Sequence, residues 1–242
     1  MKRLFDKDEV LFAVCWIVLY VVGFGSADAI SETIGMPKAV TVCLGLVLSA
    51  ALLAFIRRNG LREYYGLCGV KGGLESLLYL LPLAAVASIN LWNGLTLQGD
   101  FFAVLLYVVS MCFVGFLEEV IFRGLLFRGM CKTNVSTAIL VSSLTFGMGH
   151  AVNLLMGAPL ADTLLQLVYA SAVGFLFTAV FHVGGSILPC IAAHILVNVS
   201  SIFAVEPGLG GRVVMALVQS VVAVVCGMWI LRRGRTEELE RK

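Results

Sequence analysis

The chain alternates long apolar runs with short polar segments. A membrane-spanning helix needs about 20 mostly apolar residues to cross the hydrocarbon layer. By that measure we predict eight spans, at residues 9–26, 38–57, 74–93, 101–128, 136–155, 161–182, 186–204 and 211–232. Lipid excludes open sheets, and no run has the alternation of a barrel strand. The pattern predicts an all-α, polytopic membrane bundle of about eight transmembrane helices, forming a single domain over residues 1–242.

The composition agrees with a membrane protein and excludes one other class. Of the residues, 60% are apolar and 13% charged, and the mean hydropathy is +0.99. Soluble domains are about a quarter charged. The net charge of +2 and the scattered basic residues do not favour a nucleic-acid surface. Seven separated cysteines form neither a CxxC pair nor a disulfide framework, and we interpret them as small packing residues.

Basic residues mark one side of the predicted bundle. They gather at the N-terminus, in two loops and in the C-terminal tail: Lys2, Arg3, Lys7, Arg57, Arg58, Arg62, Lys71, Arg128, Lys132, Arg232, Arg233, Arg235, Arg241 and Lys242. The opposite side carries Lys38 and Arg212. Because basic loops stay in the cytoplasm, both termini are predicted to be cytoplasmic. The small residues around Asp28 resemble a signal-peptide cleavage site, but the long apolar run before them favours a retained first helix.

Ionisable residues inside three of the spans form the candidate site. A charge at the centre of a span costs about 3 kcal/mol, so such residues usually carry function. They occur in an EExxxR, an FxxxH and an HxxxN segment, namely Glu118, Glu119 and Arg123, then Phe146 and His150, then His194 and Asn198. On an α-helix Arg123 lies about 40° from Glu119 and about 140° from Glu118. Glu119 is therefore predicted to pair with Arg123, leaving Glu118 without a local cation.

The three segments have overlapping depths, which predicts one site, open toward the cytoplasm. Glu118, helped by His150, can activate a water, while His194 and Asn198 can donate to the oxyanion formed during amide hydrolysis. Phe146 can shield the face of His150. A zinc ion held by Glu118, His150 and His194 is an open alternative, although the HExxH motif is absent. We interpret four further polar residues as contacts between helices or at helix ends: Asn90, Asn93, Asn153 and Gln166.

In order and spacing, the three segments resemble the CAAX protease and bacteriocin-processing family of intramembrane proteases. The resemblance covers residues 74–204, and the first two spans are generic. It implies that Glu118 and His150 activate water and that His194 and Asn198 form the oxyanion hole. Members have been labelled both glutamate proteases and metalloproteases. Eukaryotic relatives cleave prenylated CAAX proteins, whereas bacterial ones are linked to peptide maturation, bacteriocin immunity or surface-protein display.

The predicted function is therefore an intramembrane endopeptidase of a bacterial cell membrane. Its substrate would be a small peptide precursor or the tail of a membrane-associated protein, cut near the cytoplasmic side, and its other contacts are with lipid. Two alternatives use the same residues. A proton-coupled transporter would relay protons through Glu118 and the histidines. A non-catalytic bacteriocin-immunity protein would keep the cluster only to hold its helices together.

Overall fold

The computed structural model describes residues 1–70, 78–96 and 99–240. Within them the structure is helical, without strands apart from an isolated bridge between Leu95 and Ala204. In chain order the elements are α1 (Lys2–Lys7), α2 (Glu9–Thr33), α3 (Ala39–Arg58), η1 (Leu78–Leu80), α5 (Leu81–Ala87), η2 (Ile89–Leu91), α6 (Phe101–Glu118), η3 (Glu119–Phe127), α7 (Arg128–Cys131), α8 (Val135–Gly149), α9 (Val152–Leu155), α10 (Leu160–Gly184), α11 (Leu188–Phe203) and α12 (Leu209–Glu240).

Six helical segments of the described residues are long and apolar enough to cross a membrane. They are Glu9–Thr33, Ala39–Arg58, Phe101–Cys131, Val135–Leu155, Leu160–Gly184 and Leu209–Gly234. The two other predicted spans correspond to shorter apolar helices, Leu78–Ala87 and Leu188–Phe203. At 1.5 Å per residue, α11 covers about 24 Å, less than the hydrocarbon thickness of about 30 Å. Residues 74–77 of the predicted third span, and Lys71, Arg241 and Lys242, lie outside the described residues.

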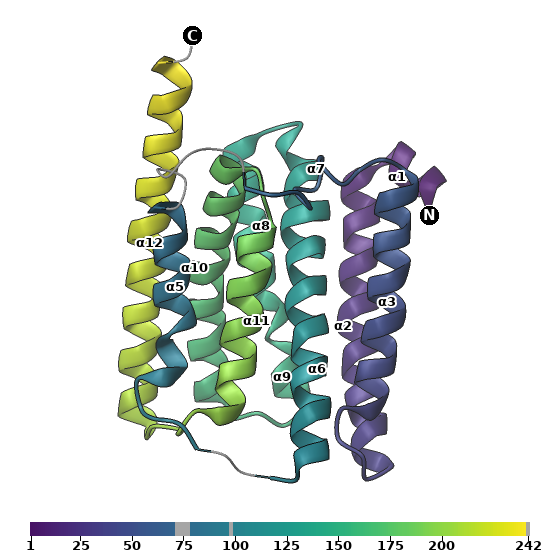
Figure 1. The fold of residues 1–242 in the computed structure, drawn as a ribbon, viewed down its shortest axis with the longest axis vertical. Helices are drawn as coiled ribbons and strands as arrows, with labels where there is room; N and C mark the ends of the chain where they lie inside the picture. Colours follow the sequence, from purple (N-terminus) through teal and green to yellow (C-terminus); the bar gives the residue numbers. More distant parts are fainter. Residues whose placement is uncertain (71–77, 97–98, 241–242) are drawn as a thin grey trace.

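The helices lie side by side in one bundle (Figure 1). In this view α2 and α3 form one edge, α5 and α12 form the other, and α6, α8, α10 and α11 lie between them. Both termini lie at the upper end, together with α7. The turn from α2 to α3 lies at the lower end. The structure thus places both termini on one side, as the loop charges predicted.

Side-chain caps at one end of three long helices fix where each begins. Asp8 accepts from the backbone N–H of Leu11 at the start of α2, and Asn134 accepts from the backbone N–H of Thr137 at the start of α8. Asp100 accepts from two backbone N–H groups at the start of α6. Such caps satisfy donors that a helix leaves free in its first turn. They help set the height at which each helix presents its polar residues.

The helix that carries EExxxR changes its winding at this motif. Phe101–Glu118 is α-helical, but Glu119–Phe127 is a π-helix in which every residue is buried. Wider π turns occur frequently at functional sites. The sequence analysis assumed a uniform α-helix here, because no single residue marks the change of winding.

Candidate active site

Glu119 and Arg123 form the predicted ion pair. Arg123 Nη1 donates to Glu119 Oε1 over 2.9 Å, and both side chains are fully buried. The guanidinium also lies over the Phe146 ring, 4.0 Å from its centre. Gly174 makes room for this arrangement, because a Cβ there would lie 3.1 Å from Arg123 Nη2. The pair therefore connects η3 to α8 and α10.

His194 joins this pair to Glu118. Its Nδ1 lies 2.8 Å from Glu119 Oε1, and because a carboxylate only accepts, Nδ1 is the donor. Its Nε2 lies 3.5 Å from Glu118 Oε2. The sequence predicted a purely structural pair of Glu119 with Arg123, whereas Glu119 also binds α11 through His194. The structure thus brings both glutamates, the arginine and one histidine into a single buried cluster.

Glu118 has a further partner that the sequence analysis did not identify. The phenol of Tyr20, on α2, donates to Glu118 Oε1 over 2.6 Å, and both residues are buried. Tyr20 also packs against the Phe24 ring at 4.6 Å between centres. The sequence offered one signal, a tyrosine inside the apolar run of a span that was considered generic.

His150 is held by a chain of two carboxamides. It caps the C-terminal end of α8, and its Nδ1 lies 3.2 Å from Gln166 Nε2 on α10. Asn153 Nδ2 donates to Gln166 Oε1 over 2.8 Å, which turns the Gln166 amine toward the imidazole. Nδ1 of His150 then accepts, and the proton of the neutral ring is on Nε2. Asn153 and Gln166, interpreted from the sequence as ordinary polar residues, position a candidate catalytic group.

Phe146 contacts His150, the residue that it was predicted to shield, and also His194. Its ring meets those of His150 and His194 edge-on, with centres 5.6 and 5.7 Å apart. It is 4% exposed and carries Arg123 on its face. A single aromatic side chain therefore orients residues from η3, α8 and α11.

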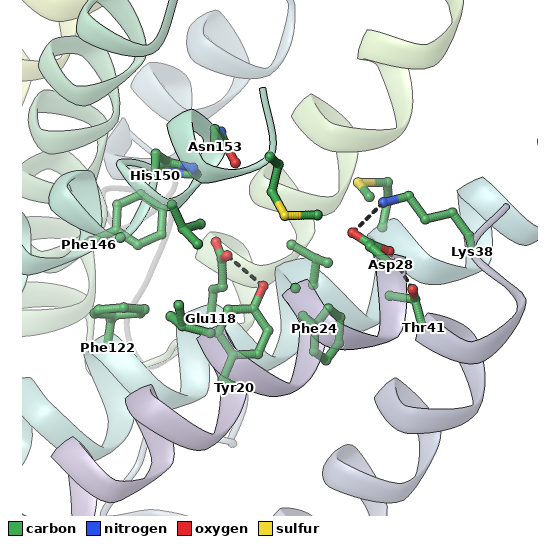
Figure 2. Close-up of a pocket in the computed structure, with 17 residues that line it drawn as sticks. Tyr20, Phe24, Asp28, Lys38, Thr41, Glu118, Phe122, Phe146, His150 and Asn153 are labelled. Atoms are coloured by element: carbon green, nitrogen blue, oxygen red, sulfur yellow. Dashed lines mark hydrogen bonds and ion pairs between the residues drawn. The ribbon is translucent and has the colours of Figure 1, made fainter. Parts of the chain in front are cut away.

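Glu118 and His150 line the same cavity, of about 150 Å³ (Figure 2). Its wall is mostly apolar and comes from α2, α3, α6, η3, α8 and α9. Toward its outer part lie Asp28 and Lys38, an ion pair at 2.8 Å, and Thr41, which donates to Asp28. Such a cavity, with a few convergent polar groups, is a typical site for a ligand.

The cavity extends away from the end of the bundle that holds the termini. Its outer residues, Asp28, Lys38 and Met156, belong to the α2–α3 region and to the segment after α9, at the lower end in Figure 1. The sequence predicted an opening toward the cytoplasmic end. The lining residues extend toward the other end, and the side from which the site is entered stays a prediction, because overlapping depths establish that residues can meet but not from which side they are reached.

Asn198 does not line the cavity that contains Glu118. It lies one turn beyond His194 on α11 and lines a second cavity, between α10, α11 and α12. The structure therefore brings Glu118, His150 and His194 around Phe146, and places Asn198 on the neighbouring side of α11.

The described residues do not form a metal-binding group. Among them no set of three or more His, Cys, Asp or Glu side chains is arranged to hold an ion. One atom of each predicted zinc ligand is engaged with another protein group, since Glu118 Oε1 accepts from Tyr20, His194 Nδ1 donates to Glu119 and His150 Nδ1 meets Gln166. This arrangement does not fit a zinc ion, which needs converging ligands at about 2 Å.

The fold and the site define a polytopic helical membrane protein with a buried Glu–His–Arg cluster beside a cavity. Residues 100–200 match the family model described as type II CAAX prenyl endopeptidase Rce1-like. The match includes every predicted site residue and confirms the resemblance to CAAX-type intramembrane proteases. It supports an intramembrane endopeptidase in general. Comparisons with curated proteins and with solved structures found no match.

Proposed function

We propose that this protein hydrolyses a peptide bond within the membrane, with Glu118 as the general base on a water molecule. The observation that carries the proposal is a cavity lined by Glu118 and His150, in which Glu118 is held by Tyr20 and His194. A general base must be buried enough to be reactive and fixed within reach of the water. Glu118 meets both conditions, being 8% exposed and hydrogen-bonded at one oxygen.

The buried cluster surrounds Glu118 with groups that can pair with a carboxylate. Arg123 donates to Glu119 over 2.9 Å. His194 lies between the two carboxylates, with Nδ1 donating to Glu119 Oε1 and Nε2 3.5 Å from Glu118 Oε2. Because a buried carboxylate without a partner is costly, Arg123 and His194 are the groups that make this pair of glutamates possible. Glu118 is the base that takes a proton from water in this account.

The reaction follows from these positions. Glu118 removes a proton from the water as its oxygen bonds to the carbonyl carbon of the substrate. The carbonyl oxygen becomes negative, and the Nε2–H of His150 donates to it. Glu118 then passes its proton to the amide nitrogen, the C–N bond breaks, and a carboxylic acid and an amine leave. Preorganised donors of this kind contribute about 3 kcal/mol each in proteases. The family resemblance implies His194 and Asn198 as oxyanion donors; we propose His150 for this role because it lines the cavity of Glu118, whereas Asn198 lines the neighbouring cavity.

The substrate class comes from the family match and the location of the site. We propose a small peptide precursor or the tail of a membrane-associated protein, in a bacterial cell membrane, with maturation of a bacteriocin as one such process. We also propose that no resident metal takes part, since the predicted ligands bind other protein groups. All steps above use side chains of the chain itself.

The test is hydrolysis of a defined peptide pool by protein in lipid nanodiscs, measured by mass spectrometry. We expect Glu118→Gln to lower kcat about 10²- to 10⁴-fold, the usual contribution of a general base. Glu63→Gln, an exposed residue at the other end of the bundle, should behave as wild type. Chelator-treated protein should remain active. Unchanged cleavage by Glu118→Gln would contradict the proposal. If the chelator abolished activity and added zinc restored it, the metal-free mechanism would be contradicted.

A further inference from the structure

A second cavity, of about 410 Å³, lies between α10, α11 and α12. Its wall is about half polar, a larger share than in the cavity around Glu118. Its polar side chains are Asn90, Asp162, Gln166, Tyr169, Asn198, Ser201, Glu206, Arg212 and Gln219. A lipid chain would leave these groups without hydrogen bonds, so the lining favours a polar occupant.

Two carboxamides in this cavity have no hydrogen-bond partner among the residues that the structure describes. Gln219 is 7% exposed, and within the described part of the chain nothing hydrogen-bonds to its side chain. The side-chain amide of Asn198 likewise has no partner among the described residues. Gln219 is buried and Asn198 half-buried at the wall of the cavity, so both amides are free to bind a group that enters it. Each carboxamide offers N–H donors and a C=O acceptor, the two groups that a peptide bond also carries.

The polar cavity is adjacent to the candidate active site. Gln166 lines it and contacts His150, which lines the cavity of Glu118. Asn198 lies one turn from His194 on α11. A peptide bound in the polar cavity would therefore extend toward the residues that perform hydrolysis.

Charged residues at one side of the polar cavity indicate that it is reached from water. Arg212 and Asp162 form an ion pair at 2.9 Å that joins α12 to α10, and both side chains are more than one-third exposed. Arg212 also donates to the backbone oxygen of Pro207. Glu206 lies in the same loop. A hydrophilic segment can enter here without crossing lipid.

We propose that this polar cavity binds an extended polypeptide segment of the substrate, beside the scissile bond, through the carboxamides of Gln219 and Asn198. The proposal rests on the proposed endopeptidase function. It adds the part of the substrate that is recognised, a peptide backbone paired with carboxamides, and assigns α12, outside the matched residues 100–200, to substrate binding.

Photo-crosslinking tests this proposal without requiring cleavage. The full chain in nanodiscs, inactivated by Glu118→Gln, carries a photoreactive phenylalanine at Met215, inside the cavity, or at Val214, which is 59% exposed outside it. The probe is a biotinylated pool of random ten-residue peptides. We expect peptide labelling at position 215 and little at position 214. Equal labelling at both positions, or none at 215, would overturn the proposal.

A second measurement uses the active protein. Gln219→Leu keeps a side chain of similar length but removes the hydrogen bonds, so we expect KM to rise about fivefold with kcat retained. Ser220→Ala is the matched control, because Ser220 bonds to its own helix at Ala216 and does not line the cavity. If Gln219→Leu still hydrolyses the peptides and its KM is unchanged, the inference is overturned. If position 215 is labelled but the wild-type protein hydrolyses no peptide, the proposed binding site stands and the proposed endopeptidase function is refuted.

Discussion

At the scale of single residues, the two oxygens of Glu118 have different surroundings. Oε1 accepts from Tyr20 over 2.6 Å, whereas Oε2 has no hydrogen bond among the described groups and lies 3.5 Å from His194 Nε2. A hydrogen bond to one oxygen fixes the rotation of the carboxylate. Oε2 is itself buried and lies toward His194, so Tyr20 and His194 together fix how the carboxylate is presented. Tyr20 acts as a positioning residue in this account.

Tyr20→Phe tests this role. The phenyl ring still fills its space against Phe24, but Glu118 loses its donor. We expect kcat to fall about tenfold, the value of a hydrogen bond to a charged group. KM and thermal stability should change little. Tyr65→Phe is the control, since Tyr65 is also buried but does not line the cavity. An equal loss in both variants, or a rise in KM alone, would contradict the role.

The Glu119–Arg123 pair makes a separate prediction about stability. Arg123→Met leaves the fully buried Glu119 carboxylate without its cation, which should lower the free energy of unfolding by about 3–5 kcal/mol. Adding Glu119→Gln removes the stranded charge and should recover most of this loss. Detergent-induced unfolding of both variants provides the measurement. If the double variant is no more stable than Arg123→Met, the loss comes from packing against Phe146 and not from charge.

At the scale of helices, the close packing of α8 against α10 determines where His150 lies. A Cβ at Gly147 would fall 2.0 Å from Ser171 Oγ and 2.8 Å from the backbone oxygen of Leu167. The two helices meet this closely because Gly147 has no side chain. The same contact brings Gln166 on α10 to His150 on α8. The hydrogen bond to the imidazole therefore depends on a glycine one turn away.

Gly147→Ala should consequently impair both stability and activity. The added methyl group has to push α10 away from α8, and such overpacking costs about 1–3 kcal/mol. It should also weaken the Gln166–His150 contact and lower kcat. Gly184→Ala is the matched control, because a Cβ at this helical position meets nothing within 4 Å. Both readouts come from the peptide assay and a thermal melt. Wild-type behaviour of Gly147→Ala would show that the backbones can separate freely.

The elements also show which parts of the site a sequence can predict. Spacing within one helix predicted the pair of Glu119 with Arg123 and the packing of Phe146 on His150, because residues four apart lie on one face. The contacts of Tyr20 with Glu118 and of Gln166 with His150 join different helices. They depend on how the helices pack and turn, including the π-helix after Glu118. Hydropathy alone does not determine this packing.

At the scale of the whole molecule, both cavities extend toward the end of the bundle that is remote from the termini. The Glu118 cavity extends to Lys38 and Met156, and the polar cavity reaches Glu206, between α11 and α12, and Arg212, in the first turn of α12. The basic residues concentrate at the opposite end, which the charge rule assigns to the cytoplasm. Together these positions predict that substrates reach the site from the outer face of the membrane.

Thiol labelling of intact cells tests this orientation. The seven free cysteines are first replaced by serine or alanine, and one new cysteine is introduced at Lys38, Met156, Arg58 or Lys132. A membrane-impermeant maleimide should label Lys38→Cys and Met156→Cys in intact cells, because they lie at the end remote from the termini. Arg58→Cys and Lys132→Cys, at the basic end, should react only after the cells are opened. The reverse pattern would mean that the chain is inverted relative to its charges, and that the cavity opens to the cytoplasm after all.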